Sequence, residues 1–311
     1  MEQQLDYAAV RAAAGRIAGA IRPAAVVPAA EGVWYALEYL QHTGSFKARG
    51  ARNFLAAHHR AGTLPDTGVT IASGGNAGLA CAWAARAQGV PATVFLPANA
   101  PRVKVERLRG YGAEVRLVGD RYADALAACE EFAAASGALA SHAYDHPLIA
   151  AGAGTLLDEI RAALPGLDTV VVAVGGGGLF AGIATAAREH GVRVVAAEPE
   201  NSRALNAALE AGRVVDVAVD SVAGDSLGAT RVSADALAAA RHEGVRSVLV
   251  PDPAITAARR ALWEEHRIVV EAGAATALAA LRTAPQPLGE RVAVVLCGAN
   301  TDPGDLTAPG I

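Results

Sequence analysis

The segment 42–50 could place a lysine where it can attack a carbonyl carbon. It reads HTGSFKARG, and Ser45 is a residue type favoured as a helix N-cap, which predicts a helix over 46–58. Lys47 then lies in the first turn, near the positive end of the helix dipole, where an ammonium group is disfavoured. A lysine with a lowered pKa is what imine formation requires. An ordinary solvated lysine fits the same pattern equally well.

A second segment, 73–78, reads SGGNAG and directly follows a short apolar run. A turn of this composition opens backbone N–H groups toward an anion, and Asn76 adds an amide for a specific hydrogen bond. A plain tight turn is the alternative interpretation.

A third segment contains four consecutive glycines between a β-branched run and an Ala-rich run: Gly175, Gly176, Gly177 and Gly178. Glycines let a backbone wrap closely around a phosphate, and the following helix contributes its dipole. No GK[ST] follows, so this is not a Walker loop, and the spacing does not give GxGxxG. The pattern favours a generic phosphate site over a bare turn.

Cysteine usage gives a weaker signal. Cys297 lies after the last β-branched run, where a lone cysteine is usually a small buried hydrophobe. The three cysteines are far apart and form no CxxC pair, which predicts a reduced, cytoplasmic protein.

Predicted strands and helices alternate along the chain and must position these segments. The predicted strands are 69–72, 92–96, 114–118, 169–174, 193–198 and 292–296. The predicted helices are 46–58, 77–88, 103–111, 122–136, 179–190 and 272–283. Repeated strand–helix–strand units predict an α/β fold with open, twisted parallel sheets wrapped by helices. Ligands of such sheets collect at the carboxyl ends of strands, where the three polar segments lie.

Composition limits the kind of partner. With 52% hydrophobic, 19% charged and only 5% aromatic residues, the core must be mostly Ala, Val and Leu, which suits helix-covered parallel sheets. The net charge of -4 argues against nucleic-acid binding, so a small molecule is the expected partner. Residues 1–7 lack the features of a signal peptide, and the glycine-interrupted stretch 169–187 favours a strand, loop and helix over a membrane span.

Taken together and in this order, the segments from Thr43 to Asn300 resemble the fold type II pyridoxal-phosphate enzymes. Within them, the segments resemble most specifically the serine/threonine dehydratase (threonine ammonia-lyase) family. The fold that this resemblance implies is the tryptophan synthase β-like fold. The resemblance implies pyridoxal 5'-phosphate as cofactor and Lys47 as the catalytic, Schiff-base lysine. It assigns cofactor binding to Phe46, Lys47, Asn76, Gly175, Gly176, Gly177, Gly178 and Cys297. It assigns the substrate carboxylate to Ser73, Asn76 and Ala77.

The same resemblance implies the organisation and the reaction. It predicts a large cofactor-binding domain of residues 1–67 and 143–311, a small domain of residues 68–142, and a homodimer. The implied reaction is β-elimination from L-threonine or L-serine, giving 2-oxobutanoate or pyruvate plus ammonia. The sequence leaves open which β-hydroxy amino acid is preferred, and β-replacement or racemisation by the same fold are the alternatives.

Several positions depart from the family pattern. Gly74 stands where serine racemases carry a second serine, which favours elimination over racemisation. Ala204 stands where the family's divalent-cation loop has a liganding Asp, which leaves Glu198 as the only side-chain ligand, so we predict no metal. Glu271 is expected either near the cofactor ring or in a surface salt bridge.

A different enzyme class is indicated by residues 224–228, which read GDSLG and match G-x-S-x-G. A serine hydrolase would need Ser226 on a sharp turn and a later histidine as its base. Only His242 and His266 follow, neither in a DxxH motif, so this alternative is distant. We expect the segment to be a loop near the substrate side chain instead.

Overall fold

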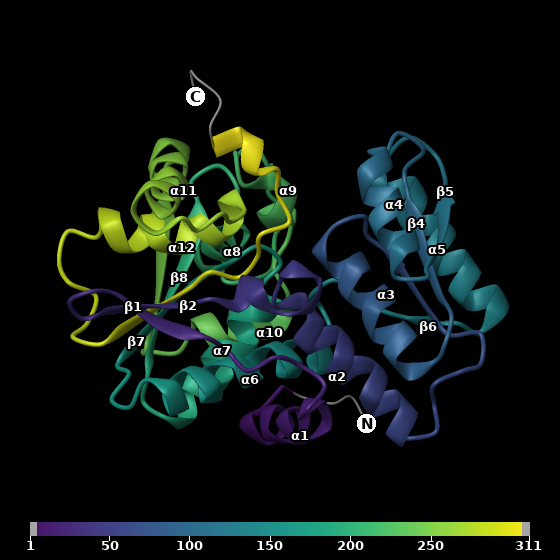
Figure 1. Ribbon diagram of the computed structural model, residues 1–311, viewed down its shortest axis with the longest axis horizontal. Coiled ribbons are helices and arrows are strands. Elements are labelled where there is room, and N and C mark those ends of the chain that lie inside the picture. The colour runs from purple at the N-terminus through teal and green to yellow at the C-terminus, as the bar shows by residue number, and fades with distance from the viewer. Residues whose placement is uncertain (1–4, 307–311) are drawn as a thin grey trace.

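The computed structural model describes residues 5–306, whose strands form two separate sheets (Figure 1). Residues 1–4, part of the stretch without signal-peptide features, lie outside the described residues. Within residues 5–306 no helix is long and apolar enough to cross a membrane. The stretch 169–187 instead forms a strand, the glycine loop and most of a helix.

The larger sheet has the strand order β1-β2-β10-β7-β8-β9. Its strands are β1 (Val26–Ala30), β2 (Val33–Ala36), β7 (Thr169–Ala173), β8 (Arg193–Pro199), β9 (Val245–Val250) and β10 (Val292–Val295). Every pairing in it is parallel except that of β1 with β2. All five residues of β7 are buried, as expected of an inner strand covered on both faces.

The smaller sheet is parallel throughout, with the order β5-β4-β3-β6, and lies on the right in Figure 1. Its strands are β3 (Val69–Ala72), β4 (Ala92–Leu96), β5 (Glu114–Leu117) and β6 (Leu139–Ala140). All four lie within residues 68–142. The domain boundaries stay a proposal, because Phe54 and Leu55 of the preceding helix pack into the core of this smaller sheet.

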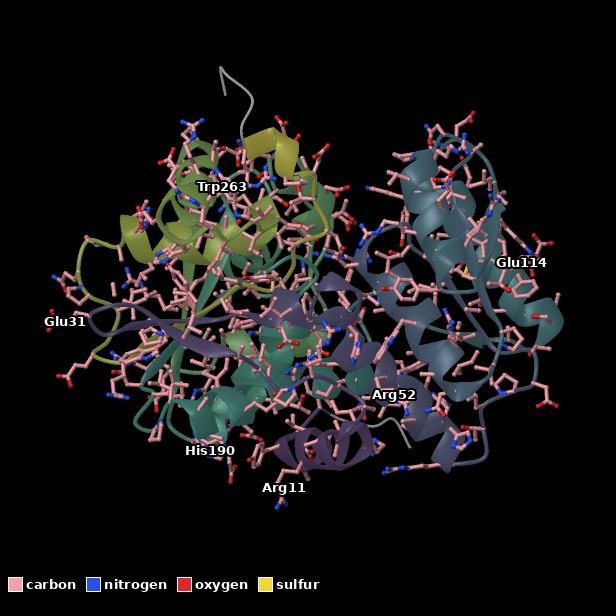
Figure 2. The ribbon with its side chains drawn as sticks, in the orientation of Figure 1. Arg11, Glu31, Arg52, Glu114, His190 and Trp263 are labelled. Carbon is pink, nitrogen blue, oxygen red and sulfur yellow. The ribbon has the colours of Figure 1, made fainter. Side chains whose placement is uncertain are left out.

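Helices cover both sheets. They are α1 (Tyr7–Ile17), α2 (Lys47–Arg60), α3 (Asn76–Gln88), α4 (Arg102–Gly110), α5 (Tyr122–Ser136), α6 (Pro147–Ala163), α7 (Gly178–Glu189), α8 (Ala204–Ala211), α9 (Gly224–Leu227), α10 (Ala234–Ala240), α11 (Asp252–His266) and α12 (Ala272–Thr283). Three short 3₁₀ turns are η1 (Glu38–Leu40), η2 (His42–Gly44) and η3 (Pro303–Leu306). Figure 1 shows α2 between the two sheets, and Figure 2 places Arg52 on it.

α6 and α7 cross at backbone distance through two glycines. A Cβ on Gly182 would lie 2.1 Å from the Ala150 carbonyl oxygen, and a Cβ on Gly154 would lie 2.6 Å from the Gly182 carbonyl oxygen. Even a methyl group therefore has no room at this crossing. Since α7 begins at the glycine loop, the crossing also fixes where that loop lies.

We expect Gly182→Ala to lower the free energy of unfolding by about 1–3 kcal/mol, because the added methyl group overpacks the crossing. Gly15→Ala is the matched control, since a Cβ at this helical glycine meets nothing within 4 Å. The control should gain about 0.5–1 kcal/mol, the usual preference for Ala over Gly in a helix. Urea unfolding of the three proteins measures both effects, and equal shifts would contradict the packing argument.

Candidate active site

The site begins where α2 meets the end of β10. The backbone N–H of Phe46 donates to the Cys297 carbonyl oxygen at 2.9 Å, and Ser45 forms an isolated bridge with Gly298. The prediction that Ser45 caps the helix was wrong: α2 begins at Lys47, no side chain caps it, and the Ser45 hydroxyl is buried without a hydrogen-bond partner. Backbone pairing with the loop after β10, rather than a cap, holds the start of this helix.

Lys47, the first residue of α2, is partly buried and faces the segment before α6. Its Nζ donates to the Ala143 carbonyl oxygen at 2.7 Å and lies 4.8 Å from the centre of the Phe46 ring. Burial lowers the pKa of Lys47 to about 8, although the Glu271 carboxylate acts in the opposite direction. An amine with this pKa is partly neutral near neutral pH, which is the form that attacks carbonyl carbons.

The glycine loop connects β7 to α7 and has no room for a side chain at Gly176, Gly177 or Gly178. Gly177 has φ of +93°, which disfavours any other residue there. A Cβ on Gly176 would lie 2.3 Å from Cδ1 of Tyr144, and a Cβ on Gly178 would lie 2.8 Å from the Tyr144 carbonyl oxygen. The loop thus brings bare backbone and the N-terminus of α7 to the same place, which suits a phosphate group.

Tyr144 is a residue for which the sequence predicted no role. Its ring covers Gly176, its hydroxyl donates to the Arg231 carbonyl oxygen at 3.2 Å, and with Phe46, Lys47 and Gly178 it lines a small cavity. The lysine and the glycine loop are therefore neighbours through the segment Ala143–Tyr144. No periodic pattern could have indicated this contact, because it joins residues distant in the sequence.

Asn76, the first residue of α3, belongs to a polar cluster on the other side. Its Nδ2 donates to both carboxylate oxygens of Glu271 at 3.0 Å, and its Oδ1 accepts from Asn300 Nδ2 at 2.5 Å. Glu271 is buried and also accepts from the Asn300 backbone N–H at 2.8 Å. The surface alternative for Glu271 was therefore wrong, and burial raises the pKa of its carboxyl group.

A second cavity opens beside this cluster. It is lined by Gly74, Gly75, Asn76, Leu79, Lys104, Arg107, Asp225, Ser226, Glu271 and Asn300. Ser73 and Ala77 flank the lining segment without being part of the lining. Cys297 is buried next to Lys47 and Glu271, and burial raises the pKa of its thiol to about 12, so the group is neutral at neutral pH.

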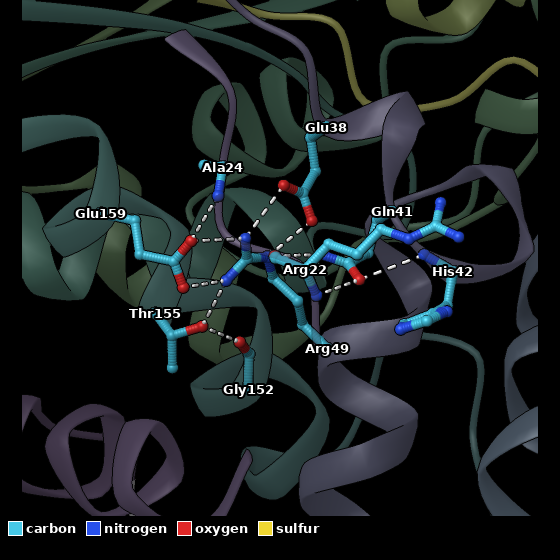
Figure 3. A network of polar contacts seen from close by, with 9 residues as sticks. All are labelled: Arg22, Ala24, Glu38, Gln41, His42, Arg49, Gly152, Thr155 and Glu159. Atoms are coloured by element: carbon cyan, nitrogen blue, oxygen red, sulfur yellow. Dashed lines mark hydrogen bonds and ion pairs between the residues drawn. The ribbon is translucent and has the colours of Figure 1, made fainter. Parts of the chain in front are cut away.

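A buried ion network anchors α2 two residues beyond Lys47 (Figure 3). Arg49 is fully buried; its Nε donates to Glu38 at 2.5 Å, and its NH1 donates to Glu159 at 2.7 Å. Glu38 lies on η1 and Glu159 on α6, so the guanidinium ties α2 to both. Removal of one partner from a buried ion pair strongly destabilises the fold. The network therefore fixes the register of the helix that presents Lys47.

The GDSL segment forms the short helix α9 rather than a strand-to-helix turn. Ser226 lines the second cavity, and within residues 5–306 its hydroxyl has no histidine partner. The His242 ring accepts from the Gly244 N–H at 3.2 Å, and the His266 ring faces Glu265. A serine-hydrolase triad is therefore not assembled here.

Glu198 caps a helix. Its carboxylate accepts from the backbone N–H groups of Leu205 and Asn206 at 2.7 and 2.8 Å, at the start of α8, and burial raises its pKa to about 7. In the described part of the chain no group of three or more His, Cys, Asp or Glu side chains could hold a metal ion. The absence of a metal stays a prediction.

The two sheets, the lysine and the glycine loop together define a class: an α/β enzyme that can hold a phosphorylated carbonyl compound beside an amine. The residues fit such a group, since the loop has room only for backbone and the nearby Thr43 and Ser45 hydroxyls are buried without partners.

Comparison with known proteins identifies the family. Residues 17–298 match the model of the pyridoxal-phosphate dependent enzyme family. The chain is 37% identical to an L-threonine ammonia-lyase of Geobacter sulfurreducens over 87% of this chain and 67% of that protein. It is 36% identical to a human serine dehydratase-like protein over 86% and 85% of the two chains. A structure of maize serine racemase superimposes with a TM-score of 0.89 at 28% identity, covering 98% of this chain and 96% of that one.

This chain therefore belongs to the pyridoxal-phosphate dependent enzymes, and its fold is that of fold type II. The predicted family, fold class and cofactor are confirmed. The roles of the individual site residues stay predictions.

Proposed function

We propose that this enzyme removes water from L-serine or L-threonine by β-elimination, releasing ammonia and pyruvate or 2-oxobutanoate. The names of the threonine ammonia-lyase and serine dehydratase-like relatives support this reaction. The observation that carries the proposal is the amine of Lys47, 2.7 Å from the Ala143 carbonyl oxygen and next to the glycine loop. It is a base of suitable pKa in the same cavity as Gly178, where the glycine loop meets the N-terminus of α7.

The cofactor would be held by residues in and around the two cavities. Gly175, Gly176, Gly177 and Gly178 would bind its phosphate through backbone N–H groups, Phe46 would pack against it, and Asn76 and Cys297 would contact its ring. When bound, pyridoxal phosphate draws electrons from the substrate's Cα and so acidifies the Cα proton. A neutral Cys297 thiol moderates that withdrawal, which favours prompt loss of the β-hydroxyl over amine transfer.

The chain's own residues then move one proton. Lys47, with its pKa near 8, removes the Cα proton as a general base. Ser73, Asn76 and the N–H of Ala77, at the N-terminus of α3, would hold the substrate carboxylate. This orientation fixes the Cα–H bond toward the lysine. The β-hydroxyl takes up one proton and leaves as water, which balances the proton that Lys47 removes from Cα.

Position 74 separates elimination from racemisation. Racemisation needs a second acid–base group on the opposite face, and Gly74 supplies none. A Cβ there would lie 2.8 Å from Cδ2 of Leu96, so that space is already apolar. The division into a large domain of residues 1–67 and 143–311 and a small domain of residues 68–142 belongs to this proposal, as do a homodimeric state and a cytoplasmic location.

The test is release of 2-oxo acid from L-serine and L-threonine by purified protein supplied with pyridoxal phosphate. Release from either amino acid supports elimination, and the ratio of kcat/KM values names the preferred one. Bound cofactor with no release from either would overturn the proposal.

Loading of the cofactor onto the apoprotein should become faster with rising pH and level off above about 8. The neutral amine of Lys47 is the reactive form, so its fraction falls about tenfold per pH unit below a pKa of about 8. An ordinary lysine, with a pKa of about 10.4, would keep accelerating up to that pH. The visible absorbance that grows after mixing measures the rate, and a free lysine derivative is the control. A rate without a plateau would show an ordinary lysine.

A further inference from the structure

The cavity beside Asn76, next to the residues expected to hold the substrate carboxylate, is lined mostly by polar residues and glycines. Of the ten described residues that line it, Leu79 is the only one with a large apolar side chain. The other lining residues are glycines or carry a polar or charged group, so hydrogen-bonding and charged atoms are available to a substrate side chain. A polar or charged group at the end of the substrate therefore fits this lining.

Two cations enter this cavity from one face of α4. Lys104 and Arg107 are three residues apart, so they lie on the same side of the helix. Both reach from the smaller-sheet side to the opposite rim. Lys104 Nζ pairs with Asp225 Oδ1 at 2.7 Å, and Arg107 NH2 donates to Asn300 Oδ1. Asn300 in turn contacts Asn76, so Arg107 lies next to the expected substrate site.

Arg107 has a neutral partner, whereas Lys104 and Arg102 of the same helix each pair with a carboxylate. The cavity holds two carboxylates: Asp225 is paired with Lys104, and both oxygens of Glu271 accept from Asn76. On the same helix, Arg102 pairs with Glu106 at 2.5 Å. Arg107 is exposed and forms no ion pair within the described residues, so its guanidinium is open to a ligand that enters the cavity. A guanidinium strongly prefers a carboxylate, which it binds through two parallel hydrogen bonds, over an amide oxygen.

We propose that Arg107 binds a second carboxylate on the substrate and that Lys104 adds positive charge beside it. The substrate is then a β-hydroxy amino acid with an acidic side chain, namely 3-hydroxyaspartate. This rests on the proposed β-elimination. Lys47 takes the Cα proton, the β-hydroxyl takes up one proton and leaves as water, and a Cα–Cβ double bond forms, with no net change in protons. Addition of water at Cα and departure of ammonia then give oxaloacetate, so the atoms balance.

The kinetic test compares L-serine, L-threonine and L-threo-3-hydroxyaspartate on the holoenzyme. The wild-type kcat/KM should be highest for 3-hydroxyaspartate. Arg107→Met should lower that value by about tenfold to hundredfold more than it lowers the value for L-serine, the range expected for loss of a charged hydrogen bond. Arg102→Met, which removes an exposed charge from the same helix, should leave both within about twofold. A wild-type preference for L-serine, or equal losses in Arg107→Met, would overturn the proposal.

A binding test separates this proposal from the reaction itself. L-Aspartate and L-2-aminobutyrate have no β-hydroxyl to lose, so their binding is read from the change in the visible absorbance of the holoenzyme. L-Aspartate should bind more tightly to the wild type, and Arg107→Met should abolish the difference. If this holds while no substrate releases 2-oxo acid, the elimination proposal fails and the carboxylate site stands. If L-serine is consumed but L-aspartate binds no more tightly, the carboxylate site fails alone.

Discussion

Lys47→Ala should lower kcat for 2-oxo acid release by at least about 10⁴-fold, since general-base catalysis alone contributes about 10²–10⁴-fold and the covalent attachment of the cofactor is lost as well. The variant should also lose the visible absorbance of the bound cofactor. Lys47 is the first residue of α2, so its truncation removes no helix cap and no buried ion pair.

Arg60→Ala is the matched control, because Arg60 is an exposed cation at the far end of the same helix. It should keep both activity and absorbance. Circular dichroism of each protein shows whether the fold is retained. Appreciable turnover by folded Lys47→Ala would sink the assignment of the base.

Gly176→Val should raise the dissociation constant of pyridoxal phosphate by about 100-fold or more, the equivalent of losing one or two charge-assisted hydrogen bonds. A Cβ at this position would lie 2.3 Å from the Tyr144 ring, so the isopropyl group must displace Tyr144 or block the backbone N–H groups of the loop. Titration of the apoprotein with the cofactor, followed by absorbance, measures the constant.

Two further variants separate these effects. Gly15→Val adds the same side chain to α1, where a Cβ meets nothing within 4 Å, and should leave the affinity unchanged. Gly176→Val/Tyr144→Ala gives the valine room. If the loop itself binds the phosphate, the double variant stays weak. Full recovery of affinity would mean that the displaced tyrosine, and not the cradle, caused the loss.

Much of the sheet structure could be predicted from local pattern. The strands predicted over 69–72 and 92–96 match β3 and β4, because each is a short apolar run bounded by Gly or Pro. The hairpin of β1 and β2 was missed since Pro28 interrupts the run, and Pro is tolerated at this edge of the sheet. The helix α6 was missed as well, because its glycines have low helix propensity. In the structure, the packing of α6 against α7 outweighs that low propensity.

The site was predictable in its segments and not in its contacts. Lys47 and the glycine loop stand out by residue type. Glu271 and Asn76 are 195 residues apart, and no spacing in the sequence indicates that they share two hydrogen bonds. No role was predicted for Tyr144 for the same reason. The lowered pKa of Lys47 was expected from the helix dipole, whereas its main cause is burial, which only the packed structure reveals.

The attachment site of the cofactor can be located directly, because the chain contains only two lysines, Lys47 and Lys104. Borohydride reduction of the holoenzyme fixes the cofactor to the amine that carries it, and mass spectrometry of the digested protein identifies that residue. We expect the adduct on Lys47 alone. An adduct on Lys104, or on neither lysine, would contradict the account of this active site.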